Sequence, residues 1–191
     1  ARRRARRFPL FLLVLCCALA TAQGPTEPEA AASEPTNIVF NFSETSWEEV
    51  ARWLADIGKR SLLIESKPTG TFSYFDKRAY TFREALDVIN GVLLTKGHAL
   101  LLRNNFLILA DLKEGVPPHM VERVDPADLP KLGRTELVKV LLTLKGLVAD
   151  EAKKEFESMS SPHGRIISLP TTNQLLIVDT AQNAQQIVGL I

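Results

Sequence analysis

Apolar residues between Asn37 and Asp111 follow two different spacings along the chain. One set recurs every three or four positions, which is the period of a helix with one buried face. It forms two stripes, Trp47, Val50, Leu54 and Ile57, then Phe82, Ala85, Leu86, Ile89 and Leu93. Both stretches are therefore predicted to be amphipathic helices.

Each predicted helix begins with the same signal. Ser46 precedes Glu49 by three residues, and Thr81 precedes Glu84 by three residues. In such a capping box the hydroxyl accepts a hydrogen bond from the glutamate N–H, and the glutamate side chain accepts one from the N–H of the cap. The helices are expected to start at Trp47 and Phe82.

Strand patterns surround the two helices. Alternating apolar residues or short apolar runs occur at Ile38–Phe42, Ser61–Glu65, Thr71–Phe75, Ala99–Leu102 and Phe106–Leu109. The last two runs flank Asn104-Asn105, and a two-residue Asn loop suits a hairpin because Asn tolerates positive φ. The order βαββαββ predicts a small α+β domain over residues 37–111, with two helices packed on a small mixed sheet.

A second pattern of this kind covers residues 134–191. Strand signals appear at Val138–Leu144, Arg165–Leu169 and Leu175–Asp179. Asp150 is positioned to cap a helix that carries Ala152, Phe156 and Met159 on one face, and a last helix is expected after Thr180. The order βαββα predicts a second sandwich-like α+β domain, similar to a KH fold, with two helices on a small mixed sheet.

The remaining segments are predicted to lie outside these two domains. Arginines precede the apolar run Phe8–Ala20, and Ala20-Thr21-Ala22 ends it, so residues 1–22 are typical of a secretory signal peptide. A retained membrane anchor is the alternative, although the run is shorter than the roughly 20 residues of a membrane span. A lipoprotein signal at Cys16 or Cys17 is disfavoured because Leu15 is not small. Pro, Glu, Ala and Ser dominate residues 23–36, which are predicted to be a flexible lead, and four prolines mark 112–133 as a linker.

Removal of the predicted signal peptide changes the composition. Both cysteines of the chain are lost, so no disulfide can form in the mature protein. Five arginines are also lost, which leaves 18 Lys and Arg against 22 Asp and Glu and a net charge of −4 instead of +1. This balance does not favour nucleic-acid binding, which is usually accompanied by a basic patch.

The sequence contains no pattern typical of an enzyme or of a metal or cofactor site. His98, His119 and His163 are far apart and have no metal-ligand spacing. Ser158, Ser160 and Ser161 lie near His163, but no Gly-x-Ser-x-Gly motif surrounds them. We therefore expect no catalytic residue, no metal and no cofactor.

Residues Leu169–Asp179 resemble the Thr-Asn-x-Leu-Ile-Val turn and strand of the periplasmic repeats of secretins. The helix before this motif and the helix after it match the rest of that (NolW-like) repeat. Asn41-Phe42-Ser43, the Gly70 turn, Phe82–Asp87 and the hairpin that ends at Leu109-Ala110-Asp111 resemble the short N-terminal domain shared by secretins and TonB-dependent transducers. The aromatic strand Phe72–Phe75 departs from the aliphatic alternation usual in that family.

The resemblance implies the periplasmic N-terminal region of a secretin-like outer-membrane channel for protein secretion, of the type II or the type IV pilus kind. Its implied partners are other copies of itself in a ring, an inner-membrane secretion or pilus component, and the exported protein. The signalling domain of a TonB-dependent transducer is the alternative. Because Ile191 is apolar and has no C-terminal cap signal, we expect a fragment that lacks the pore domain, rather than a short stand-alone protein.

Two sites are predicted to contact partners. Trp53 falls off the main stripe of its helix, so it either packs at the edge of the core or forms part of an interface. The run Phe106, Leu107, Ile108 and Leu109 is predicted to be an edge strand to which a partner strand could add, because chain-terminal strands often lie outside.

Overall fold

The computed structural model describes residues 36–191, which belong to one compact unit. The predicted signal peptide lies outside the described residues, and so does the predicted lead up to residue 35. No helix within residues 36–191 is long and apolar enough to cross a membrane.

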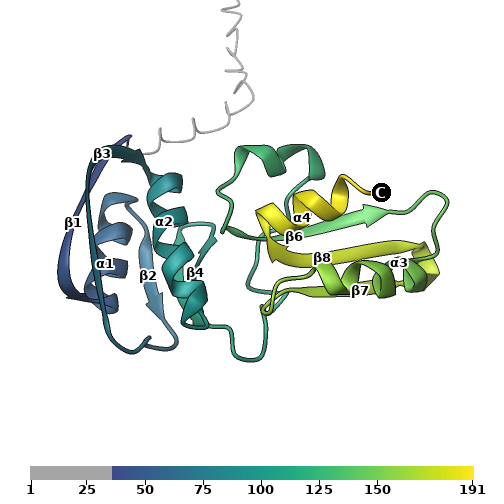
Figure 1. The fold of residues 1–191 in the computed structure, drawn as a ribbon, viewed down its shortest axis with the longest axis horizontal. Helices are drawn as coiled ribbons and strands as arrows, with labels where there is room; N and C mark the ends of the chain where they lie inside the picture. Colours follow the sequence, from purple (N-terminus) through teal and green to yellow (C-terminus); the bar gives the residue numbers. More distant parts are fainter. Residues whose placement is uncertain (1–35) are drawn as a thin grey trace, which may run out of the picture. The chain divides into compact units, whose positions relative to one another are not determined.

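The N-terminal half, residues 36–111, contains the predicted order of elements. These are β1 (Thr36–Ser46), α1 (Trp47–Ile57), β2 (Ser61–Ile64), β3 (Thr71–Thr81), α2 (Phe82–Thr95), β4 (His98–Arg103) and β5 (Phe106–Asp111) (Figure 1). The α+β class is confirmed, but the strands form two sheets instead of one. β1 and β3 pair in an antiparallel ribbon, while β2, β5 and β4 form a mixed sheet in that order.

The two helices bury their apolar faces in a core to which both sheets contribute. Phe40 and Phe72 enter this core from the ribbon, and Leu107 and Leu109 enter it from the mixed sheet. Every residue of the two predicted stripes is buried except Ile57, which is half-buried.

Both capping boxes are present. The Glu49 N–H donates to Ser46 Oγ at 3.3 Å, and the Ser46 N–H donates to Glu49 Oε2 at 3.2 Å. The equivalent distances between Thr81 and Glu84 are 3.3 and 2.8 Å. These reciprocal bonds satisfy N–H groups that a helix start would otherwise leave without a partner.

The C-terminal half, residues 134–191, also follows the predicted order. Its elements are β6 (Leu137–Thr143), α3 (Ala149–Phe156), β7 (Arg165–Leu169), β8 (Gln174–Thr180) and α4 (Ala181–Val188). The sheet has the order β6-β8-β7 with antiparallel pairing between its strands, and an isolated parallel bridge joins Arg123 to Lys139 of β6. Consecutive strands β7 and β8 are joined by a tight turn, which imposes antiparallel pairing.

The start of α3 is organised by Asn173 and not by the predicted Asp150 cap. The N-cap residue is Val148, whose side chain makes no capping bond. Asn173 Oδ1 instead accepts from the Ala149 N–H at 2.9 Å, and Asn173 Nδ2 donates to the carbonyls of Leu144 and Leu147. The Asn of the Thr-Asn motif thus fixes the loop that leads into the helix, while Asp150 accepts a hydrogen bond from Ser168 Oγ.

The connecting segment, residues 112–133, is packed against both halves. It includes a short 3-10 helix, η1 (Pro126–Lys131), and three buried side chains that lie in a third apolar cluster. This cluster also contains residues of the mixed sheet and of the C-terminal sheet; its buried members are Ala99, Leu101, Ile108, Ala110, Leu112, Val116, Val121, Leu137 and Val178. The mixed sheet is therefore covered on both faces.

Polar contacts accompany this apolar cluster. Arg83 Nη1 on α2 lies 3.0 and 3.1 Å from the two carboxylate oxygens of Glu136. Asp87 Oδ1 accepts from the N–H and the hydroxyl of Thr135, each at 2.6 Å. A Cβ at Gly133 would lie 2.9 Å from Asp87 Oδ1, so glycine permits this close approach.

Candidate interaction surfaces

Trp53 belongs to an aromatic cluster against the β1–β3 ribbon. Its ring centroid lies 4.8 Å from that of Phe42 in an edge-on arrangement and 5.6 Å from that of Phe40. The side chain is only partly buried. Trp53 therefore packs at the rim of the core and keeps one part of its surface available to a partner.

Strand β5 is the central strand of the mixed sheet, so the prediction that Phe106–Leu109 forms an edge is wrong. It pairs with β2 in parallel and with β4 in antiparallel register. Although β5 comes last in the N-terminal half, the parallel crossover places β2 on its far side. No further strand can add to β5. Of its predicted contact residues, Phe106 exposes 49% of its surface, whereas Leu107, Ile108 and Leu109 are buried.

The outer edge of β4 is closed by a side chain of α2. Asn90 is fully buried; its Oδ1 accepts from the Leu100 N–H at 2.7 Å, and its Nδ2 donates to the Leu100 carbonyl at 3.0 Å. The amide thus takes the place of a neighbouring strand. The sequence contained a signal for this role, because Asn90 lies four residues after Leu86 and three before Leu93 on the buried stripe.

The outer edge of β6 is closed by the connecting segment. The Lys139 N–H donates to the Glu122 carbonyl at 3.1 Å, and the Val124 N–H donates to the Lys139 carbonyl at 2.9 Å. This short parallel contact leaves β7 as the uncovered edge of the C-terminal sheet.

A buried carboxylate fixes the loop before β7. Asp179 is fully buried and accepts hydrogen bonds from Ser160 Oγ at 2.9 Å and from the backbone N–H groups of Ser161 at 2.8 Å and Thr180 at 2.6 Å. A Cβ on Gly164 would overlap the Asp179 carboxylate, so this position requires glycine. Ser160 and Ser161 therefore bind a structural carboxylate, whereas Ser158 Oγ donates to the Glu155 carbonyl.

The histidines also have structural contacts. His163 Nδ1 and Nε2 lie 3.2 and 3.3 Å from the carbonyl oxygens of Leu112 and Leu94. His98 is buried and lies within hydrogen-bond distance of Ser66 Oγ and the Lys96 carbonyl. Within residues 36–191 no three His, Cys, Asp or Glu side chains are grouped so that they could hold a metal ion.

A polar cluster lies on β3 of the ribbon. Tyr80 Oη donates to Asp76 Oδ2 at 2.5 Å, and this hydrogen bond raises the pKa of Tyr80 to about 12 and lowers the pKa of Asp76. The Arg78 guanidinium lies 4.3 Å from the centre of the Tyr80 ring. These contacts tie the side chains of Asp76, Arg78 and Tyr80 together on the strand.

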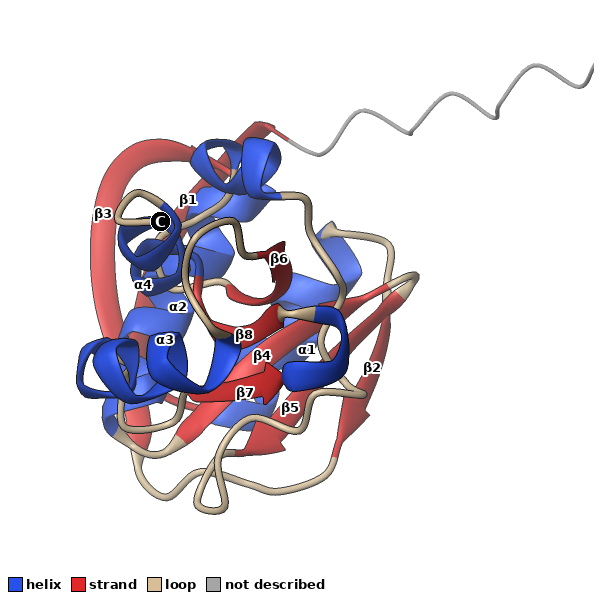
Figure 2. Cartoon of the chain, turned by 90° about the vertical axis from the view of Figure 1, so that its right-hand side faces the viewer, coloured by secondary structure: helices blue, strands red, loops and turns tan. Residues whose placement is uncertain are grey.

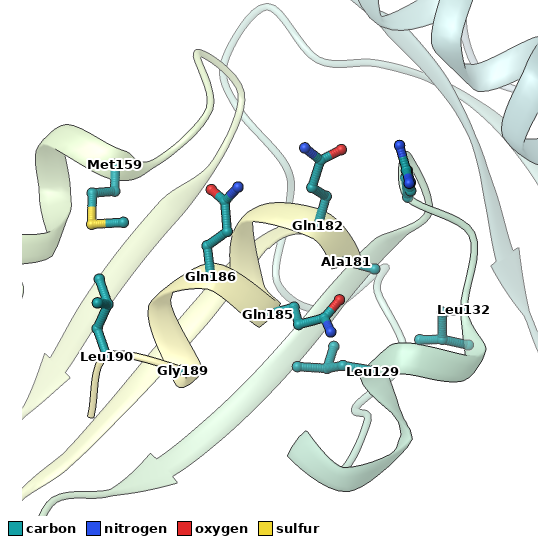
Figure 3. Close-up of a pocket in the computed structure, with 10 residues that line it drawn as sticks. Leu129, Leu132, Met159, Ala181, Gln182, Gln185, Gln186, Gly189 and Leu190 are labelled. Atoms are coloured by element: carbon teal, nitrogen blue, oxygen red, sulfur yellow. The ribbon is translucent and has the colours of Figure 1, made fainter.

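A groove of about 670 Å³ lies between η1, α4 and the short 3-10 helix Glu157–Met159 (Figure 3). Gln182, Gln185 and Gln186 project from α4 along it, and Leu129, Leu132 and Leu190 provide apolar walls. The glutamines offer hydrogen-bonding groups without charge. Arg134 is the one charged residue in the lining.

No protein-family model and no curated protein matches the sequence. Solved structures do resemble it. A chain of the Klebsiella pneumoniae type II secretion system outer-membrane complex of PulD, PulS and the PulC HR domain matches 78% of this chain and 25% of its own length, with 15% identity and a TM-score of 0.62. The N-terminal domain of the secretin XcpQ from Pseudomonas aeruginosa matches 81% of this chain with 13% identity and a TM-score of 0.35.

The GspC–GspD complex of enterotoxigenic Escherichia coli matches 82% of this chain and 96% of the compared chain, with 12% identity and a TM-score of 0.34. The chain spans 63% of the XcpQ fragment and a quarter of the Klebsiella chain. At these identities the similarity describes the fold. The fold resembles that of secretin N-terminal domains.

Proposed function

We propose that the chain is the periplasmic N-terminal region of a secretin-like outer-membrane channel for protein secretion, in which it assembles with identical copies and docks other components. The observation that carries this proposal is the similarity to the Klebsiella outer-membrane complex at a TM-score of 0.62 over 78% of the chain. A match to 78% of the chain is longer than residues 36–111 alone or residues 134–191 alone. The signalling domain of a TonB-dependent transducer would account only for residues 36–111.

Small α+β units suit assembly into a ring. In rings of such units, one copy can place a helix face against a strand face of the next. Such heterologous contacts form a closed ring when the rotation from each copy to the next adds up to a full turn. In this proposal the other partners are an inner-membrane component of the secretion machine and the exported protein, and the site of action is the periplasmic face of the outer membrane.

The exposed parts of Trp53 and Phe106 are the proposed docking points on the N-terminal half. Aromatic side chains are enriched at interfaces because they contribute a large contact area at little entropic cost. Leu107, Ile108 and Leu109 would act indirectly, since their buried side chains hold β5 and therefore Phe106 in place.

Calorimetric titration tests the docking role. The purified chain is titrated with the periplasmic domain of the inner-membrane secretion component from the same cell, which we expect to bind without any chemical turnover. Phe106→Ala should weaken binding by about tenfold, corresponding to about 1.4 kcal/mol for an interface aromatic. Val148→Ala is the matched control, because it removes a comparably exposed apolar side chain from the C-terminal half. Absence of binding by the unmodified chain would contradict this docking role.

A further inference from the structure

Strand β2 has one open backbone edge. It lies at the border of the mixed sheet and pairs only with β5 (Figure 2). The N–H groups of Ser61 and Glu65 donate to carbonyl groups on the β5 side at 2.9 and 3.0 Å. Because backbone groups alternate along a strand, those of Leu62 and Ile64 point away from β5. No side chain of residues 36–191 binds them, in contrast to the edge of β4, where Asn90 takes the place of a strand.

An exposed apolar side chain lies at the middle of this edge. Leu62 and Ile64 pack against the core of the N-terminal half, so Leu63 between them lies on the other face of the sheet, where 47% of its surface is exposed. Its neighbour across the sheet is Ile108 of β5, which is buried. Ile108 and Leu63 thus form an apolar row that ends at the open edge.

The two ends of the edge carry opposite charges. Lys59 precedes β2 and Glu65 follows it; both are exposed, and neither forms an ion pair within residues 36–191. Asp56 lies on the exposed face of α1, one turn from Arg52. The other charged side chains around the edge already have contacts: Arg52, Lys67, Glu48 and Arg60. A strand with a free ammonium group at its start and a free carboxylate at its end is complementary to a second copy of itself that runs in the opposite direction.

We propose that β2 pairs in antiparallel register with β2 of a second copy of this chain, so that two three-stranded sheets become one sheet of six strands. Leu62 of each copy then lies opposite Ile64 of the other, and their open N–H and C=O groups form hydrogen bonds. Leu63 meets Leu63 of the second copy at the two-fold axis, which shields both side chains from water. Lys59 comes next to Glu65 of the second copy at both ends, whereas parallel pairing would bring like charges together.

This contact is separate from the contacts of the proposed ring. It is isologous, because the same surface of both copies forms it, and it closes after two copies. Ring contacts are heterologous and repeat around an axis. The inference therefore does not rest on the proposed function. Phe106 lies beside Ser61 and not beside Leu63, so Phe106→Ala should leave the pairing of copies unchanged within about twofold.

Sedimentation equilibrium tests for the pair of copies. The purified chain, measured from about 1 to 500 µM, should show a monomer–dimer equilibrium, because an edge of four residues gives a contact of micromolar strength or weaker. Leu63→Lys should raise the dissociation constant by about tenfold or more, since it brings two ammonium groups together at the two-fold axis. A chain that stays monomeric over this range, or a dimer that Leu63→Lys does not weaken, would overturn the proposal.

Charge reversals at the two ends test the direction of pairing. Lys59→Glu and Glu65→Lys should each weaken self-association by about three- to tenfold, because like charges then meet at both ends. An equimolar mixture of the two variants should associate again, because each end of the mixed pair joins an ammonium group to a carboxylate. Lys77→Glu makes the same change at an exposed position of β3 and should have less than about a twofold effect. Circular dichroism confirms that the variants are folded, and failure of the mixture to associate would contradict antiparallel pairing of β2.

Amide hydrogen exchange identifies the edge. Exchange of the Leu62 and Ile64 amides should slow as the protein concentration rises through the dissociation constant. The amides of Ile166 and Ser168 on β7, the open edge of the C-terminal sheet, should keep their rates. Exchange at Leu62 and Ile64 that does not depend on concentration, or protection that grows at β7 instead, would show that the copies do not meet through β2.

Discussion

The two halves of the molecule have similar orders of elements but are stabilised in different ways. In the N-terminal half, large side chains such as Phe40, Phe72 and Phe82 fill the space around the helices, and Asn90 is the one fully buried polar side chain among its described residues. In the C-terminal half, small alanines on α3 and α4 meet the sheet, while Asp179 and Asn173 hold the loops.

This difference indicates how each half will respond to change. A core of large apolar groups loses stability through cavities. A small core held by buried polar groups loses stability when one hydrogen-bonding partner is removed, because the remaining groups are left buried without partners. The same contrast applies to the edges: the outer edge of β4 is closed by Asn90, whereas that of β7 is open.

The largest expected effect is a cavity in the N-terminal half. Leu54 on α1 and Leu86 on α2 are both buried at the centre of their stripes. Either change to Ala should lower the free energy of unfolding by about 2–5 kcal/mol. Urea denaturation followed by circular dichroism measures it, with Leu63→Ala on the exposed side of β2 as the control. Losses below about 1 kcal/mol at both sites would show that the helix faces are assigned wrongly.

Removing the buried carboxylate tests the polar ties of the C-terminal half. Asp179→Ala leaves the Ser161 and Thr180 N–H groups without their acceptor, and we expect a loss of about 1.5–3 kcal/mol. The control Asp150→Ala removes an acidic residue that accepts one hydrogen bond from exposed Ser168 Oγ, and it should cost much less. If denaturant melts show the same loss in free energy of unfolding for both substitutions, buried polar groups do not stabilise the C-terminal half in the way described.

Removing the Asn90 amide should leave the outer edge of β4 open, as the outer edge of β7 is. Asn90→Leu keeps the apolar stripe of α2 continuous but leaves the Leu100 N–H and C=O groups without partners, at a cost of about 1–3 kcal/mol. Exchange of the Leu100 amide should accelerate more than exchange of the Leu109 amide on the neighbouring strand. If protection of Leu100 is unchanged in the folded variant, Asn90 does not close this edge.

The smallest expected effect comes from the capping boxes. Hydrogen bonds from Ser46 lower the pKa of Glu49, and those from Thr81 lower the pKa of Glu84. A carboxyl group whose pKa is lower in the folded state contributes stability above its unfolded pKa, and that stability is lost as the pH falls through the folded value. Stability should therefore decline slightly below about pH 4.5, the ordinary glutamate pKa.

Glu49→Gln with Glu84→Gln is the matched variant for this measurement. Glutamine can still accept from the cap N–H but does not titrate, so the decline in stability between about pH 5 and 3 should become shallower. Glu151→Gln, an exposed residue in the first turn of α3, serves as the control. An unchanged slope in the double variant would mean that the capping carboxylates do not contribute to the acid sensitivity.

Much of the fold could be predicted from the sequence because helix starts and hydrophobic periods are local. The capping boxes predict that the helices begin at Trp47 and Phe82, as they do in the structure. The runs of alternating apolar residues locate the strands. Which strands pair is a non-local property, and this is why β5 was predicted to be an edge although it is central. A strand pattern states which face is apolar and does not identify the neighbouring strand.

The polar ties were harder to predict for a related reason. Asp179 ends an apolar run and Asn90 interrupts another. A polar residue at such a position suggests the end of an element or an exposed site. Their roles depend on partners such as Ser161 and Leu100, 18 and 10 residues away in the chain. A buried polar residue can be recognised from periodicity, but its partner becomes known only from the fold.

The proposal that this chain is the periplasmic region of a ring-forming channel can be tested by imaging the protein in its native assembly. Envelope membranes are separated by density, the protein is extracted from the outer-membrane fraction in mild detergent, and single particles are averaged by electron microscopy. We expect ring-shaped particles that contain this chain, and loss of the density on the periplasmic side when residues 36–191 are deleted. Recovery of the protein only as a monomer, or only outside the outer-membrane fraction, would contradict it.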